Sequence, residues 1–189
     1  MKTKGVTYMS KNDNPHAIRL YESVLKHSNR TAADKIANQY PLSKAADIDK
    51  EFTWAESICA DLENEFDDEM VKTIRMDCVC GPDMGNLSNF KNMYQSSTDL
   101  EEFVSNINNQ NQGFTIEYDD NALYYIYPEC YCPCVNRIDK PISKTWCFCT
   151  LGYTKKMFEY ILDRKVDVSL IESIKTGGSI CKIKVTYFN

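Results

Sequence analysis

The sequence predicts an α+β protein in which an N-terminal helical half packs on an antiparallel sheet of two hairpins with a crossing helix. Three observations predict this class. Apolar residues recur at helical spacing through much of residues 1–112, and they alternate with polar residues in two later stretches. Helical spacing returns between those two stretches. The expected order after residue 113 is therefore strand, strand, helix, strand, strand.

Successive helices are predicted for the first half. Asn14 and Pro15 are typical of a helix N-cap and a first helical position, and the apolar stripe that follows predicts one buried face. A second helix is expected from Thr31, and Ser43 is expected to cap a longer third helix. A fourth helix is expected from about Asp68.

A further helix is predicted by Thr98–Glu101, which has the form of a capping box. It ends in a polar stretch at 106–112, which we expect to be the hinge between two halves, 1–112 and 113–189. A chain of 189 residues is long enough to bury one core, so the two halves are expected to form a single domain.

The second half carries strand patterns. Alternating residues at 114–119 and the aromatic run Tyr124–Tyr127 predict one β-hairpin. Residues 146–162 predict the crossing helix, because their apolar positions return to helical spacing. Val166–Leu170 and Cys181–Tyr187 alternate again around a pair of glycines and predict the second hairpin.

The charge balance limits the partners. A formal net charge of −5 disfavours a surface built to hold nucleic-acid phosphates or anionic lipid, so we expect no nucleic-acid partner. No segment approaches the roughly 18 apolar residues of a membrane span, and the N-terminus lacks an apolar signal region. We therefore expect a cytoplasmic protein without a membrane partner.

Clustered cysteines are the most informative chemical feature. Seven of the nine cysteines fall into three short groups, which are Cys78 and Cys80, then Cys130, Cys132 and Cys134, then Cys147 and Cys149. In a reducing cytosol, clustered cysteines indicate metal ligands or reactive thiols more often than disulfides.

A zinc site is the leading interpretation of these groups. Cys130 and Cys132 follow the first predicted hairpin, and Cys147 and Cys149 open the crossing helix. Four sulfurs on two loops can form a closed tetrahedral zinc site. The positive end of the helix dipole favours the thiolate forms of Cys147 and Cys149.

Other interpretations of the cysteines stay open. Cys78 and Cys80 are candidate replacement ligands or a second set, and an iron–sulfur cluster is the alternative cofactor although the usual C-x-x-C-x-x-C run is missing. Some of these cysteines can instead be small hydrophobes under the helix. His16 and His27 add little, since both lie in the first predicted helix.

The C-terminal part resembles a known family. The resemblance rests on the segments Cys147–Tyr153, Phe158-Glu159, Val166–Leu170 and Glu172–Ile183. Over roughly residues 114–189 they resemble 4-vinyl reductase domains, which are small-molecule (hydrocarbon-binding) domains, and more distantly the 2-amino-thiazoline-4-carboxylate hydrolase-like proteins. The cysteine pairs look like those of an uncharacterised bacterial cysteine-rich branch.

The resemblance implies a pocket between helices and sheet. Aromatic residues near the cysteines suit such a pocket, although residues at these spacings are equally typical of a core; they are Tyr124, Tyr125, Tyr127, Trp146, Phe148, Tyr153 and Phe158.

We therefore expect a small-molecule-binding or sensor domain with a cysteine-thiolate metal site and a small apolar or thiol-containing ligand. The alternative is a cysteine-dependent hydrolase of a small thiazoline-like substrate, with Cys149 or Cys132 as the nucleophile. A third reading is a structural interaction module that forms a homodimer.

Overall fold

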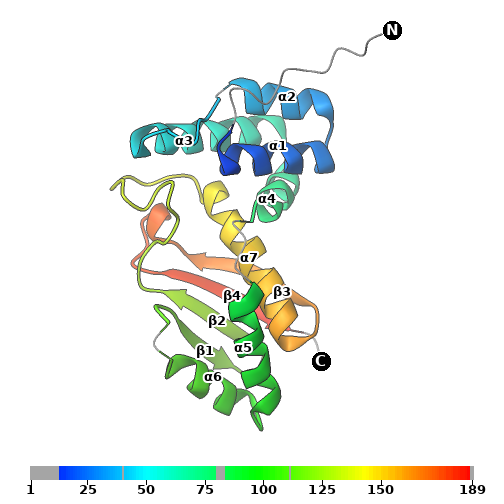
Figure 1. Cartoon of the computed structure of the whole chain (residues 1–189), viewed down its shortest axis with the longest axis vertical. Coiled ribbons are helices and arrows are strands. Elements are labelled where there is room, and N and C mark those ends of the chain that lie inside the picture. Colours follow the sequence, from blue (N-terminus) through cyan, green and yellow to red (C-terminus); the bar gives the residue numbers. More distant parts are fainter. Residues whose placement is uncertain (1–12, 40, 80–83, 111, 188–189) are drawn as a thin grey trace. The chain divides into compact units, whose positions relative to one another are not determined.

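The structure is a computed structural model that describes residues 13–39, 41–79, 84–110 and 112–187. These residues form seven α-helices and a four-stranded antiparallel sheet, which confirms the α+β class (Figure 1). The chain divides into two compact units. The first holds residues 1–78 and 132–139, and the second holds residues 79–131 and 140–189.

The first unit is built from helices. Its elements are α1 (Pro15–His27), α2 (Arg30–Gln39), α3 (Ile48–Glu65) and α4 (Asp68–Asp77). Helix α1 packs on both α2 and α4, and α3 contacts α2 and α4. The buried side chains face one another at the centre of this bundle: Leu20, Val24, Ile36, Ile58, Leu62 and Ile74 are each at most 1% exposed.

Two helix starts in this unit test the sequence predictions. Asn14 is the N-cap of α1, because its side chain accepts a hydrogen bond from the His16 N–H, as predicted. The prediction that Ser43 caps the third helix was wrong. The Ser43 hydroxyl accepts from the Ala45 N–H within a local turn, and α3 starts later with Asp47 as its cap.

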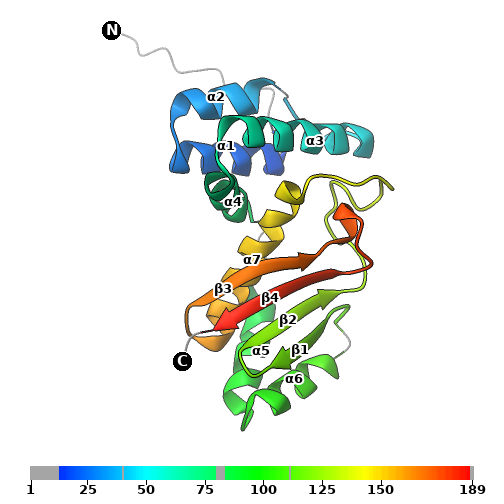
Figure 2. The same ribbon diagram turned by 180° about the vertical axis from the view of Figure 1, so that it is seen from behind.

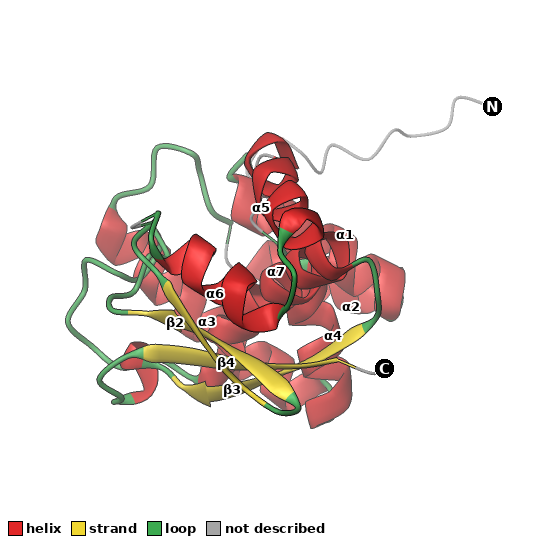
Figure 3. Cartoon of the chain, turned by 90° about the horizontal axis from the view of Figure 1, so that it is seen from below, coloured by secondary structure: helices red, strands yellow, loops and turns green. Residues whose placement is uncertain are grey.

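The second unit contains the sheet. Its elements are α5 (Met84–Ser96), α6 (Leu100–Asn108), β1 (Thr115–Asp119), β2 (Ala122–Tyr127), α7 (Lys144–Leu162), β3 (Val166–Glu172), the 3₁₀ turn η1 (Ile174–Thr176) and β4 (Cys181–Tyr187). The strand order is β1-β2-β4-β3, with every neighbouring pair antiparallel. Figure 3 shows helices α5 to α7 on one face of this sheet.

Residue alternation gives the sheet two unlike faces. Leu123, Tyr125 and Ile183 are at most 3% exposed, and the ring of Tyr125 contacts Phe158 of α7. The opposite face is turned toward the viewer in Figure 2. It carries the polar side chains of β1 and β4. There the Lys182 ammonium pairs with Glu117 at 2.7 Å. One face is therefore core and the other is solvated, as expected for an antiparallel sheet.

Helix α5 was not predicted from the sequence. Asparagine recurs along it at Asn86, Asn89 and Asn92, and asparagine is a poor residue for a helix interior. Leu87 and Phe90 are nevertheless buried, and α5 packs on α6 and α7. Tertiary packing therefore overrides a weak local preference.

The capping box before α6 lies one residue later than predicted. Asp99 is the N-cap and accepts from the Glu102 N–H at 2.8 Å, while the Glu102 carboxylate accepts from the Thr98 N–H and hydroxyl. Within the stretch expected to be a hinge, the Asn108 side chain exchanges two hydrogen bonds with the Ile116 main chain. The compact units divide at residues 78 and 79, whereas the sequence places the junction of the halves at 112 and 113.

Among the helices that the structure describes, none combines the length and the apolar character that crossing a bilayer requires.

Candidate functional site

A groove of about 560 Å³ lies in the first unit. One side is a face of α3, where Asp49, Lys50, Thr53, Trp54 and Ser57 recur at helical spacing. The other side is the end of α2 and the α2–α3 connection, which contributes Gln39, Pro41, Leu42, Ser43, Ala45 and Ala46. The volume falls within the range of about 300–1,000 Å³ that is typical of small-molecule sites.

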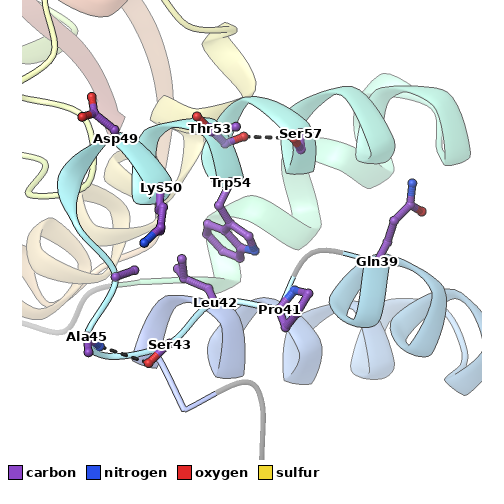
Figure 4. Close-up of a pocket in the computed structure, with 11 residues that line it drawn as sticks. Gln39, Pro41, Leu42, Ser43, Ala45, Asp49, Lys50, Thr53, Trp54 and Ser57 are labelled. Atoms are coloured by element: carbon purple, nitrogen blue, oxygen red, sulfur yellow. Dashed lines mark hydrogen bonds between the residues drawn. The ribbon is translucent and has the colours of Figure 1, made fainter.

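The floor of the groove is apolar and aromatic. Figure 4 shows the Trp54 indole pointing from α3 toward Leu42 and Pro41. Trp54 is 4% exposed and Leu42 is 3% exposed, so both side chains are held by packing. A ligand that binds against this floor therefore does not first have to order a mobile side chain.

The rim of the groove is polar. The Lys50 ammonium lies 3.1 Å from Asp47, and hydrogen bonds from Lys50 lower the pKa of Asp47. The Ser57 hydroxyl donates to the Thr53 carbonyl oxygen at 2.9 Å. The rim therefore presents positive groups, negative groups and hydroxyls side by side. This mixture does not favour a strongly charged ligand of either sign.

Cysteines of the first unit lie mostly in its interior. Cys78 is 4% exposed and its thiol donates to the Ile74 carbonyl oxygen at 3.3 Å. Cys134 is 1% exposed, whereas Cys132 is half-buried. Burial is the main cause that raises the pKa of Cys78, which disfavours the thiolate that metals and electrophiles require.

Cys78 should accordingly resist alkylation in the folded protein. We expect iodoacetamide to label it ~100-fold more slowly in the native state than in urea, because reaction requires opening of the bundle. Peptide mass spectrometry after timed labelling at pH 8 measures this ratio, and Cys147 in the same sample serves as a half-buried comparison. Equal labelling rates of Cys78 in the two states would contradict its place in the core.

In the second unit, Cys147 and Cys149 lie inside α7 rather than on a loop that opens it. The Cys147 sulfur lies 3.3 Å from the Ser173 hydroxyl, and the Cys149 thiol donates to the Trp146 carbonyl oxygen at 3.4 Å. Residues two apart on an α-helix are rotated by about 200° from each other. The two sulfurs therefore leave the helix on opposite sides.

The predicted zinc site on Cys130, Cys132, Cys147 and Cys149 is not supported. Among the residues that the structure describes, no three Cys, His, Asp or Glu side chains are grouped to hold a metal ion. Helix geometry separates two of the four proposed ligands. Cys80, proposed with Cys78 as a second set, lies outside the described residues.

The aromatic residues expected to line a pocket behave in part as core. Tyr125 packs edge to face on Tyr127 and Phe158, with ring centroids 4.6 and 5.7 Å apart, and burial raises the pKa of Tyr127 well above its ordinary value. Tyr124 lies on the polar face, where its hydroxyl donates to Asp119 at 2.7 Å. Interlocking rings of this kind are typical of a packed interior.

The groove over Trp54 was missed by sequence reasoning. Its aromatic residue follows the same helical stripe as the core of α3, so sequence spacing alone assigns it to the core. A weak signal was available in the proline and small residues of the connection before α3, at Pro41, Ala45 and Ala46, because these side chains leave space beside a large indole.

Solved structures similar to this chain are H-NOX proteins. One is an H-NOX protein from S. oneidensis in the Fe(II)NO ligation state, at 13% identity and a TM-score of 0.46, covering 93% of this chain and 99% of that chain. Another is an H-NOX domain from Shewanella oneidensis in the Fe(II)CO ligation state, at 13% identity and a TM-score of 0.45, covering 93% and 98%. At these values we draw no inference about ligand or activity from them.

No curated protein matches the sequence. A family model does match, over residues 10–189, and its description is a family of unknown function, DUF6144. The match spans nearly the whole chain, and the chain therefore belongs to the DUF6144 family.

Proposed function

We propose that this protein is a small-molecule-binding domain that holds a small apolar ligand in the groove over Trp54. The observation that carries the proposal is the groove of about 560 Å³ with a buried indole and Leu42 at its floor. The resemblance of residues 114–189 to 4-vinyl reductase domains remains a separate prediction of small-molecule binding, because it concerns residues outside this groove.

The ligand class follows from the lining. The apolar floor supplies binding free energy through burial of apolar surface, at about 25 cal/mol per Å² before the costs of association. The charged residues of the lining are Asp49 and Lys50, which carry opposite signs, so no net charge of the lining selects an anion or a cation. An uncharged molecule with an apolar body and one or two polar groups fits this arrangement best.

Filling the groove tests the proposal. We expect N-phenyl-1-naphthylamine, an uncharged probe that fluoresces in apolar surroundings, to bind the full chain saturably. Ser57→Phe places a ring on the α3 side of the groove, one turn after Thr53 and Trp54, and should weaken this binding ~10-fold or more, because the ring takes the place of the ligand.

The control is Glu56→Phe, which adds the same ring one residue earlier on the exposed side of α3, outside the groove. Ala45→Phe fills the groove from the facing connection and should reproduce the loss. Thermal melts verify that all three variants fold. Equal loss in Ser57→Phe and Glu56→Phe, or no loss in either groove variant, would contradict the proposed site.

A second candidate function is the cysteine-dependent hydrolase, with Cys147 rather than Cys149 as its thiolate. The Ser173 hydroxyl oxygen accepts a hydrogen bond from the Lys175 N–H. The hydroxyl hydrogen of Ser173 is therefore available to the Cys147 sulfur. The first turn of α7 adds the positive end of the helix dipole. Cys149 instead donates to a carbonyl oxygen, which favours its neutral thiol.

Thiol labelling separates the two candidates. If Cys147 is an activated thiolate, iodoacetamide at pH 7 should label it several-fold faster than Cys149, and Ser173→Ala should reduce that rate. Peptide mass spectrometry of briefly labelled protein measures both rates. Labelling of Cys149 or Cys132 before Cys147 would remove the basis for this assignment. Zinc or an iron–sulfur cluster on the cysteine segments remains a prediction, which metal analysis of the purified chain tests.

A further inference from the structure

A second cavity, of about 360 Å³, lies within the second unit. It is formed by the end of α5, the start of α6 and the turn after α7. Helix α7 is ended by Asp163, which adopts the left-handed conformation with φ 54°. Arg164 follows directly and contributes its side chain to the cavity lining.

Arg164 supplies a positive charge to the cavity. Its guanidinium donates to the Tyr94 hydroxyl at 3.2 Å. Neighbouring lysines pair with acids, since Lys165 lies 3.7 Å from Glu159 and Lys91 lies 3.3 Å from Asp163. Over the residues described here, no carboxylate lies within ion-pair distance of Arg164. Its remaining N–H groups match the two oxygens of a carboxylate.

Asp99, which lines the cavity, and Glu102, which does not, both accept hydrogen bonds at the start of α6. The Asp99 carboxylate accepts from the Glu102 N–H, and the Glu102 carboxylate accepts from the Thr98 N–H and hydroxyl. Hydrogen bonds from Thr98 lower the pKa of Glu102. The lining carries one basic residue, Arg164, so it offers an ion-pair partner to one carboxylate and none to a second.

The rest of the lining is mixed, with a polar side made by Gln95, Ser97 and Thr98 and an apolar or aromatic side. On the second side Leu162 is 5% exposed, and the Tyr94 ring is held edge to face on Phe103 with centroids 5.2 Å apart. Leu100 and Tyr187 complete that side. Burial is the main cause that raises the pKa of Tyr187, so its hydroxyl stays neutral at physiological pH and is able to donate a hydrogen bond.

We propose that this cavity binds a small monocarboxylate with an apolar or aromatic body. The carboxylate pairs with the Arg164 guanidinium, the hydroxyls of Tyr94 and Tyr187 are close enough to the cavity to donate to it, and the body lies against Leu100 and Leu162. This site is separate from the groove over Trp54, and its ligand is an anion rather than an uncharged molecule.

The test is a titration of the full chain with 4-fluorobenzoate, observed by ¹⁹F NMR, beside 4-fluorobenzyl alcohol, which keeps the body and lacks the charge. Benzoate is expected to saturate, and the alcohol to bind several-fold more weakly, because it lacks the charge that pairs with the exposed Arg164 guanidinium. Arg164→Gln should weaken the binding of benzoate by a similar factor.

Lys165→Gln is the matched control, because it removes the same charge from the next residue. Lys165 is exposed and lies outside the cavity. We expect Lys165→Gln and the groove variant Ser57→Phe to leave benzoate binding within about twofold of the wild type. Thermal melts verify folding. Any of three results would overturn the proposal. Benzoate binding does not saturate, Arg164→Gln binds benzoate as tightly as the wild type does, or the wild type binds benzoate no more tightly than it binds the alcohol.

Discussion

Replacing Trp54 by alanine is expected to lower the free energy of unfolding by about 3 kcal/mol or more. The indole is 4% exposed and lies between α3 and the connection that carries Leu42, so its removal leaves a cavity that rigid helices refill only in part. Urea unfolding followed by circular dichroism measures the change.

Thr53→Ala is the matched control for Trp54→Ala, because Thr53 is the exposed neighbour on the same helix. We expect its effect to stay within about 0.5 kcal/mol. A loss below about 1 kcal/mol in Trp54→Ala would show that the indole is not held as described. Because a large loss is expected, Ser57→Phe and not Trp54→Ala is the variant suited to binding measurements.

Acid is expected to destabilise the first unit through His16. Burial, together with the positive charges of Arg19 and Arg75, lowers the pKa of His16 from 6.5 to about 4. The Arg19 guanidinium lies 3.2 Å from the His16 Nδ1, which suits a neutral ring that accepts a hydrogen bond. Protonation of His16 therefore costs more in the folded state than in the unfolded state.

The sign of the pH effect follows from this difference. Above pH 6.5 the ring is neutral in both states, so the contribution of His16 to stability is complete there, and it is lost as the pH falls toward 4. The half-buried ring is partly screened by solvent, so we expect a loss of about 1 kcal/mol between pH 7 and pH 5.

His16→Gln should remove that part of the acid sensitivity, since glutamine does not titrate, while His27→Gln changes the only other histidine and should keep it. Urea unfolding at pH 7 and pH 5 measures the difference between the variants. The same pH dependence in His16→Gln as in the wild type would exclude His16 as its source.

The sequence predicted those features of the fold that depend on residues close together in the chain. The Asn14 cap and the buried face of α7 are set by neighbouring residues, and the structure contains both. Helix α5 is held by packing on α6 and α7 against its own asparagine content, and no local pattern reveals such contacts.

The candidate sites were predicted less well for the same reason. The cysteine spacing indicated a shared metal, but the conformation of residues 147–149 is helical, and a helix places Cys147 and Cys149 on opposite sides. The groove over Trp54 and the cavity at Arg164 are each formed by segments that are brought together only in the folded unit. Short-range sequence patterns carry no information about such surfaces.

The most direct test of the proposed function uses the chain's two tryptophans, Trp54 and Trp146. Both are buried, but only Trp54 lines the groove, so Trp146 is an internal control. In protein labelled with 5-fluorotryptophan, the ¹⁹F resonance of Trp54, assigned with Trp54→Phe, should shift as N-phenyl-1-naphthylamine is added, while that of Trp146 stays in place. A shift of the Trp146 resonance alone, or of neither resonance at saturating probe, would contradict binding in the groove.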